Sequence, residues 1–243
     1  MKATPARPGS PSRAVHEAEG IMAVVPTSVP EPQVPERQAD IRLTFRLLLA
    51  VDIQGYSLRT PRMQVAAQLD LLDAMERAAA DAGLDRAAWA QQVAGDGVLA
   101  VLPDDADIVT VTGVFAPALE RALAALEERG APGHRVRVRL ALHHGALIIG
   151  WPAVLGPAGH APVVVSRLLD ARPVRRYLDA HPERNVALIV SEPIFRDVVD
   201  SGLCALPPTL FRQVRTVIKG VQYAGWLYDP GPSQCDPCGL CSA

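Results

Sequence analysis

The sequence predicts an α+β domain in which helices pack on a single sheet. Apolar runs of strand length alternate with longer segments whose apolar residues recur every three or four positions. Their order is strand, helix, two strands, helix, one or two strands, helix, strand, helix and two strands. A chain of 243 residues with 49% hydrophobic content and a mean hydropathy of +0.14 can also bury a sizeable core.

The first two elements follow from their patterns. Residues 43–53, LTFRLLLAVDI, form a continuous apolar run that is typical of a strand buried on both faces, with Asp52 at its C-terminal end. Residues 62–83 predict an amphipathic helix that ends at Gly83. The apolar face expected for this helix consists of Val65, Leu69, Leu72, Met75 and Ala79.

The segment QQVAGDGVLAVLPDD, residues 91–105, predicts a β-hairpin. Gly95 and Gly97 permit the positive φ angles that tight hairpin turns require, and Asp96 lies between them. A solvated turn residue is the ordinary interpretation of Asp96. Similarly, Asp52 could simply cap the turn that follows its strand.

The remaining elements are assigned from periodicity and from glycine and proline positions. They are a helix over 105–130 with a break near Gly113 or Pro117 and an end at Gly130, a strand turning into a hairpin over 134–150, a helix over 161–180 interrupted near Pro173, a buried strand over 185–191, a short helix over 192–202, and a strand pair over 211–220 and 224–229.

Composition argues against several classes of partner. The net charge of −2 and the pI of about 6.3 provide no basic face for nucleic acid and no polybasic membrane patch. No apolar run approaches the ~20 residues that span a bilayer, and the N-terminus lacks a secretory h-region. We therefore expect a cytoplasmic protein with a disordered Pro-rich leader over 1–40, where Met22 is an alternative start, and a flexible tail over 230–243.

Asp52 and Asp96 suggest chemistry when they are considered together. If the first strand and the hairpin are neighbours in one sheet, the two carboxylates can face each other. Close carboxylates repel unless a cation lies between them, and hard oxygen ligands favour Mg²⁺ or Mn²⁺ bridging to a phosphate. This arrangement suits two-metal phosphoryl chemistry.

Five motifs in order resemble the catalytic domain of class III nucleotidyl (adenylate/guanylate) cyclases. They are LLLAVDIQGYS, QQVAGDGVLAVLP, RVRLALHHGALIIG, GHAPVVVSRLLDA and VIKG, and the resemblance covers residues 41–229. The segment around 166–199 is most similar to a divergent actinobacterial branch. The resemblance implies a ferredoxin-like fold, a head-to-tail homodimer or a heterodimer with another cyclase-like domain, and conversion of a nucleoside triphosphate to a 3′,5′-cyclic nucleotide and pyrophosphate.

The resemblance also implies roles for individual residues. Asp52, the carbonyl of Ile53 and Asp96 would hold two divalent metals, one activating the ribose 3′-hydroxyl and the other holding the triphosphate. Arg167 from the opposite subunit would neutralise phosphate charge, and Lys219 matches a phosphate-contacting lysine. An ordinary surface or ion-pair role is the alternative for Arg167.

Three positions depart from the family pattern. Val163 stands where the family has an asparagine that orients the ribose, and a valine cannot make that hydrogen bond. Gln92 replaces the usual base-reading lysine, and the second base-reading position falls near Gly156. The base preference is therefore open, and the alternative function is a noncatalytic cyclase-homology module that binds a nucleotide or a partner protein.

The histidines and cysteines suggest weaker hypotheses. His143 and His144 lack a third ligand at metal spacing, so we interpret them as ordinary strand-end residues. A CxxCxxC pattern closes the chain, and it could bind a soft metal or act as a redox sensor. A cysteine-rich flexible end without such a role is the alternative for Cys235, Cys238 and Cys241.

Overall fold

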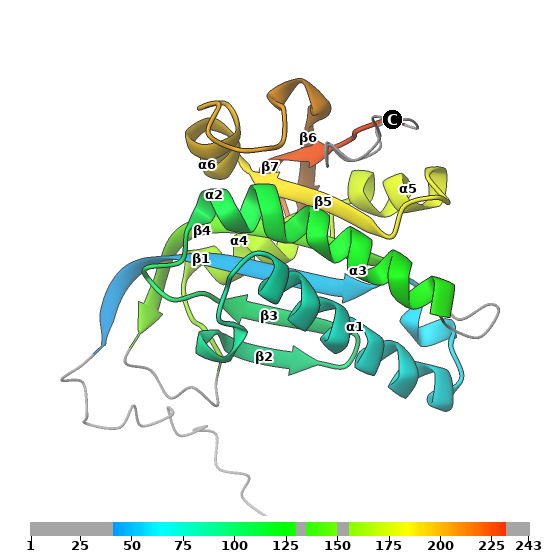
Figure 1. Ribbon diagram of the computed structural model, residues 1–243. Helices are drawn as coiled ribbons and strands as arrows, with labels where there is room; N and C mark the ends of the chain where they lie inside the picture. The colour runs from blue at the N-terminus through cyan, green and yellow to red at the C-terminus, as the bar shows by residue number, and fades with distance from the viewer. Residues whose placement is uncertain (1–40, 130–134, 150–155, 232–243) are drawn as a thin grey trace, which may run out of the picture. The chain divides into compact units, whose positions relative to one another are not determined.

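The computed structural model describes residues 41–129, 135–149 and 156–231, all within one compact unit, Ala39–Ala243. A seven-stranded sheet in the order β2-β3-β1-β4-β5-β7-β6 runs through this unit, with helices on both faces (Figure 1). The α+β class is therefore confirmed. The predicted leader, Gly130 and the three tail cysteines lie outside the described residues.

The strands pair antiparallel except for β4 and β5, which run parallel. The two longest strands, β1 and β4, pair with each other along their whole length, so the sheet is built outward from them. The strands are β1 (Arg42–Ile53), β2 (Ala90–Ala94), β3 (Gly97–Val101), β4 (Val138–Ile149), β5 (Val186–Ser191), β6 (Phe211–Ile218) and β7 (Val221–Tyr228).

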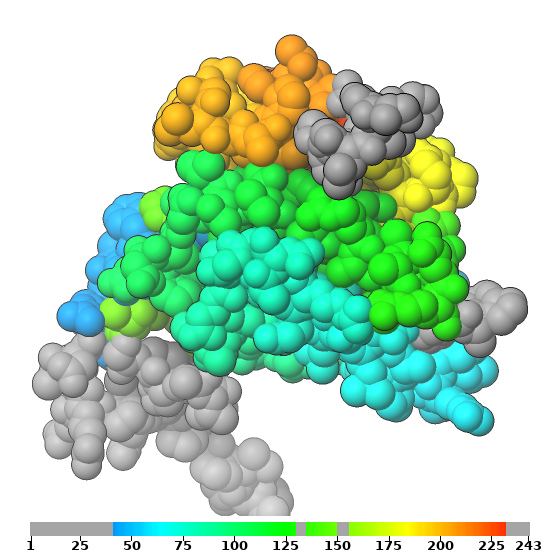
Figure 2. Space-filling view, viewed as in Figure 1, coloured from blue at the N-terminus to red at the C-terminus, as the bar shows by residue number. Residues whose placement is uncertain are grey.

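The helices divide the core into two layers. Helices α1 and α3 cover one face of the sheet and lie against each other there (Figure 2), whereas α4 and α5 pack on the other face. The helices are α1 (Pro61–Asp81), α2 (Ile108–Thr110), α3 (Ala116–Arg129), α4 (His160–Leu169), α5 (Arg172–Ala180) and α6 (Glu192–Ile194).

The predicted apolar face of α1 is wrong in part. Val65, Leu69 and Leu72 are exposed, and with Val93 of β2 they line an apolar hollow of about 210 Å³. The buried face is instead rich in alanine, which lets α1 pack closely against α3. Its residues are Ala67, Leu71, Ala74, Met75, Ala78 and Ala79.

The predicted helix break near Gly113 and the predicted hairpin within 134–150 both differ from what the structure shows. The expected break near Gly113 is a π-helical turn, Val111–Phe115, that joins α2 to α3 without interrupting the helical run. The run Ile108–Arg129 is long and apolar enough to cross a membrane by length and composition, but half of its apolar window is buried in the domain. The hairpin expected within 134–150 is instead the single strand β4.

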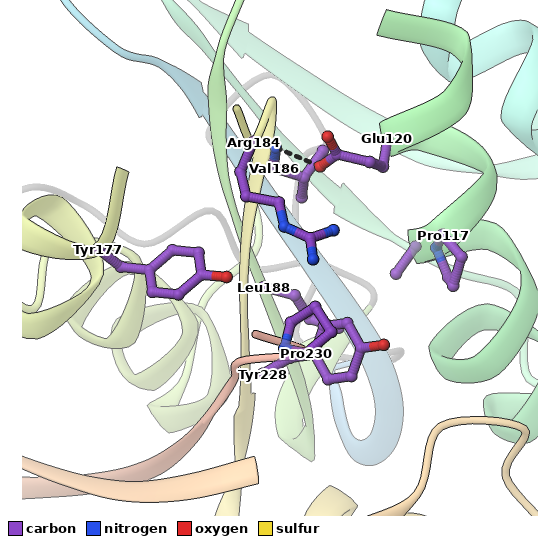
Figure 3. A pocket seen from close by; sticks show the side chains of 9 residues that line it. Pro117, Glu120, Tyr177, Arg184, Val186, Leu188, Tyr228 and Pro230 are labelled. Atoms are coloured by element: carbon purple, nitrogen blue, oxygen red, sulfur yellow. Dashed lines mark hydrogen bonds between the residues drawn. The ribbon is translucent and has the colours of Figure 1, made fainter. Parts of the chain in front are cut away.

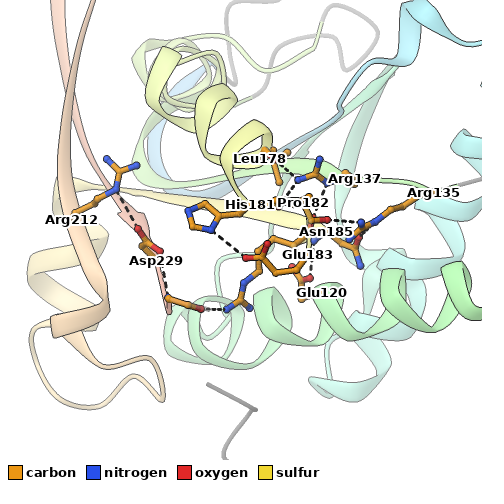
Figure 4. A network of polar contacts seen from close by, with 12 residues as sticks. Glu120, Arg135, Arg137, Leu178, His181, Pro182, Glu183, Asn185, Arg212 and Asp229 are labelled. Atoms are coloured by element: carbon orange, nitrogen blue, oxygen red, sulfur yellow. Dashed lines mark hydrogen bonds and ion pairs between the residues drawn. The ribbon is translucent and has the colours of Figure 1, made fainter. Parts of the chain in front are cut away.

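A polar network fixes the ends of β4 and β5 (Figure 4). Arg137, just before β4, donates to the carbonyls of Arg184 at 2.8 Å, His181 at 2.7 Å and Leu178. Glu120 of α3 accepts from the backbone N–H groups of Asn185 and Val186 at 2.8 and 2.7 Å. These contacts hold the loop between α5 and β5 against the end of the sheet at which β1 finishes and β4 and β5 begin.

Candidate functional site

The structure brings Asp52 and Asp96 together at the C-terminal end of β1. Asp52 pairs with Gly97 across β1 and β3, and the N–H of Ile53 donates to the carbonyl of Asp96 at 2.9 Å. The hairpin and first strand are thus neighbours, as the carboxylate hypothesis required. The turn contains Gly95 and Asp96, and Gly95 has a φ of 56°.

Gly97 is not needed for a positive φ angle in the turn, as the sequence predicted, but for another reason. It does not have a positive φ, but a Cβ at this position would lie 2.8 Å from the carbonyl oxygen of Val51. Glycine is therefore needed because the β3 backbone approaches β1 closely at the level of Asp52.

The electrostatics of Asp52 indicate a site poised for a cation. Burial raises the pKa of Asp52, the Arg139 guanidinium opposes this shift, and the Asp96 carboxylate adds to it. The side chain of Asp52 is only 15% exposed. Two carboxylates in this position repel, so a positive charge beside them is favourable.

That positive charge is Arg139, which the sequence analysis missed. Arg139 lies directly opposite Asp52 in the pairing of β1 and β4, and its Nη2 donates to Asp52 Oδ2. Its Nη1 lies 3.4 Å from Asp170 Oδ1 and 3.5 Å from the Leu169 carbonyl oxygen. Arg139 therefore links the carboxylate pair to the C-terminal end of α4.

Gln92 and Gly156, the two predicted base-reading positions, are also brought together. A Cβ on Gly156 would lie 2.4 Å from Gln92 Oε1, so the amide of Gln92 occupies the space that a side chain would take. Gln92 is opposite Leu99, which is opposite Ala50, two residues before Asp52. Strand spacing places Gln92 roughly 12 Å from Asp52 on the same face of the sheet.

Val163 and Arg167 lie one helical turn apart on α4. Val163 is 43% exposed, and Arg167 is half-buried. Positions i and i+4 share one face of a helix, so both residues belong to the outer surface of α4. Within the described residues, Arg167 makes no hydrogen bond or ion pair with either carboxylate.

Lys219 lies far from the carboxylates of its own chain. It forms the tight turn between β6 and β7 with Gly220, and it has a φ of 51°. The register of β1, β4, β5 and β7 places this turn level with the first residues of β1, while Asp52 is at the other end. Ten residues of strand correspond to roughly 30 Å, so one chain cannot bring Lys219 to Asp52.

The carboxylate pair fits a hard divalent metal, although it does not form a complete ligand set. The described residues contain no group of three His, Cys, Asp or Glu side chains that could hold a metal ion. Oxygen donors are what Mg²⁺ and Mn²⁺ prefer, and Asp52, Asp96 and the backbone of Ile53 can provide them. Such ions commonly keep waters and take substrate phosphates as their other ligands.

A second hollow lies where β5 begins (Figure 3). Glu120, Tyr177, Arg184 and Tyr228 line it, and Pro230 closes one side. Burial raises the pKa of Glu120 and raises that of Tyr177 to about 12. At about 40 Å³ the hollow has room for a few waters and is too small for a nucleotide.

Comparisons with known proteins identify the fold. No family model matches the chain, and no curated protein matches it. Solved structures do match. The adenylate/guanylate cyclase/hydrolase from Silicibacter pomeroyi is 20% identical with a TM-score of 0.55, covering 79% of this chain and 99% of the other.

Two further structures agree with that match. The adenylyl cyclase CyaB from P. aeruginosa is 14% identical with a TM-score of 0.54, covering 79% of this chain and 97% of that one. The guanylate cyclase domain of RhGC from Catenaria anguillulae, solved in complex with GTP, is 14% identical with a TM-score of 0.52, covering 77% and 98%. The described domain therefore has the fold of adenylyl and guanylyl cyclase catalytic domains.

Proposed function

We propose that this domain is a nucleotidyl cyclase that converts a nucleoside triphosphate to a 3′,5′-cyclic nucleotide and pyrophosphate. One observation carries the proposal: Asp52 and Asp96 meet at the end of β1, while Gln92 and Gly156 meet roughly 12 Å away on the same face. A nucleotide has this layout, with its phosphates and its base separated by the ribose.

Asp52, Asp96 and the carbonyl of Ile53 would hold Mg²⁺ or Mn²⁺. When bound, these ions supply charge neutralisation of the triphosphate and activation of the attacking 3′-hydroxyl. Arg139 is already beside the carboxylates, so its guanidinium can donate to phosphate oxygens of a nucleotide placed there.

Arg167 and Lys219 would come from a second copy of the chain. The strand register keeps Lys219 away from the carboxylates of its own chain, so a head-to-tail homodimer is the arrangement that could unite them. Arg167 would then neutralise charge on the transferred phosphoryl group. A heterodimer with another cyclase-like domain could supply the same groups.

Gln92 would contact the base. Its amide both donates and accepts hydrogen bonds, so it can meet the edge of adenine or guanine. Gly156 leaves room for that amide. Val163 offers no hydrogen bond to the ribose, and we therefore expect slow turnover. The relation to an actinobacterial branch and the cytoplasmic location remain predictions.

The test is product analysis by mass spectrometry. Purified protein is incubated with ATP, GTP, CTP or UTP plus Mn²⁺, and the double variant Asp52→Asn/Asp96→Asn serves as the inactive control. Asp73→Asn provides a matched control, because Asp73 lies on α1 and pairs with Arg77. We expect a cyclic product from at least one nucleotide with wild type and Asp73→Asn.

The double variant should give none. An equal yield from the double variant would contradict the site. If no nucleotide is converted but nucleotide still stabilises the wild type against heat, the noncatalytic module replaces the cyclase proposal.

A further inference from the structure

We infer that Arg139 is a switchable cation: it neutralises Asp52 while the metal is absent and, when a divalent ion binds without nucleotide, shifts toward Asp170 and the end of α4, from where a bound triphosphate can draw it onto its phosphate oxygens. This inference rests on the proposed function, because it concerns the same carboxylate pair. It assigns Asp170 as the residue that positions Arg139.

Arg139 has two sets of acceptors, one at each terminal nitrogen of its guanidinium. One nitrogen donates to Asp52, and the other faces Asp170 Oδ1 at 3.4 Å and the Leu169 carbonyl at 3.5 Å. The first contact is a full ion pair, whereas the second set lies at the limit of hydrogen-bond geometry. Arg139 therefore interacts more strongly with Asp52 than with Asp170 and the Leu169 carbonyl, and a small movement would bring it into hydrogen-bond distance of these second acceptors.

A divalent ion would disturb this balance. A doubly charged cation held between Asp52 and Asp96 would compete with Arg139 for the negative charge of Asp52, so the ion pair between Arg139 and Asp52 weakens when a metal binds. The Arg139 side chain is only 12% exposed, and water cannot fully replace that partner. Asp170, which is 46% exposed, and the negative end of the α4 dipole are the nearest alternatives.

The shift would connect the metal site to α4. Asp170 directly follows α4, and its Oδ1 also accepts from Arg175 of α5 at 2.7 Å. Arg167 lies within the last turn of the same helix. A guanidinium drawn toward this end therefore couples metal occupancy to the helix that carries the proposed phosphate-binding arginine.

The experiment measures Mn²⁺ affinity without nucleotide, by electron paramagnetic resonance of the free ion. We compare wild type, Arg139→Gln, Asp170→Asn and the double variant Arg139→Gln/Asp170→Asn. Removing Arg139 should tighten Mn²⁺ binding about threefold to tenfold, because the competing cation is gone. Removing Asp170 should weaken binding by a similar factor, because Arg139 loses its alternative acceptor.

The double variant separates this mechanism from general charge effects. If Asp170 acts through Arg139, the double variant should bind Mn²⁺ like Arg139→Gln alone, and Asp170→Glu should restore wild-type affinity. Asp179→Asn is the matched control, because Asp179 accepts from Gln54 and does not contact Arg139. Its effect should be small.

The outcomes distinguish the two proposals. If Mn²⁺ binds wild type, Asp52→Asn abolishes binding and Arg139→Gln leaves the affinity unchanged, the switch is refuted while the metal site stands. If Asp170→Asn weakens binding equally in the Arg139→Gln background, the positioning role is refuted. If neither wild type nor Arg139→Gln binds Mn²⁺, both the metal site and the switch are refuted.

Discussion

Arg137 and Arg139 lie two positions apart at the start of β4, yet their surroundings differ in kind. Arg137 donates to three backbone carbonyls at the end of α5 and in the loop before β5 (Figure 4). Arg139 faces two carboxylates and one carbonyl. Neutral carbonyls offer a divalent ion less negative charge than a carboxylate does, so the acceptors of Arg139 are the ones that can exchange a guanidinium for a metal. The acceptors, rather than the arginines themselves, separate the structural role of Arg137 from the role proposed for Arg139.

The largest expected effect is on Arg139. We expect Arg139→Gln to lower cyclic nucleotide formation by roughly a hundredfold to a thousandfold, as loss of a preorganised charge at a phosphoryl site does. The variant should also lose stability in EDTA, because Asp52 and Asp96 then repel without a counter-charge, and Mn²⁺ should restore it. Thermal unfolding with and without Mn²⁺ measures this, and a loss that Mn²⁺ leaves unchanged would contradict the assignment.

Arg137→Gln should behave in the opposite way. Three carbonyls lose a charged donor, so the free energy of unfolding should fall by about 3 kcal/mol, and Mn²⁺ should not recover it. Urea denaturation measures this loss. Arg175→Gln, at an exposed arginine of α5, is the control and should cost little. An Arg137→Gln variant that keeps its stability but loses activity would contradict the structural role of Arg137.

Neighbouring histidines of β4 offer a second contrast of the same type. His143 is 7% exposed with Nδ1 unpaired, and burial lowers its pKa from 6.5 to about 4, whereas His144 is half-buried. A lowered histidine pKa gives stability that is full above pH 6.5 and is lost as the pH falls toward 4. The loss should be about 2 kcal/mol at pH 5.

Unfolding measured from pH 7.5 to pH 4.5 should therefore show a weaker pH dependence in His143→Gln than in wild type. An unchanged slope in His143→Gln would contradict the prediction.

The smallest expected effect concerns Gln92 and Gly156, the pair proposed to read the base. Gly156 and Gly202 have similar φ angles, 74° and 77°, but a Cβ would strike Gln92 at Gly156 and nothing within 4 Å at Gly202. Alanine at either position should cost about 1 kcal/mol of stability through backbone strain. Only Gly156→Ala should also change the KM for nucleotide, by severalfold. Equal KM values for the two variants would contradict the proposal that Gln92 contacts the base.

Local patterns predicted much of the fold. The continuous apolar run of β1, the hairpin around Asp96 and the helix break at Pro173 were all predicted, because each depends on residues close in sequence. The buried face of α1 was predicted only in part, because that helix has two apolar stripes. Tertiary packing against α3 selects the stripe that is rich in alanine.

The residues of the candidate site also fall into those that local sequence predicts and those that only the fold reveals. Asp52 and Asp96 could be predicted because they interrupt apolar patterns. Arg139 could not, since an arginine alternating with apolar strand residues is typical of a solvated face. Its role depends on strand register, which places it opposite Asp52. The distance between Lys219 and Asp52 likewise depends on strand pairing, which the sequence alone does not reveal.

Complementation between two inactive variants tests the central claim most directly. Asp52→Asn/Asp96→Asn lacks the two acids proposed to bind the metals, and Arg167→Ala/Lys219→Ala lacks the groups expected from the second copy. We predict that each alone is inactive and that co-expression restores about a quarter of wild-type product, from the one intact site of each mixed dimer. Mixed dimers that form but make no product would contradict a site shared between two chains.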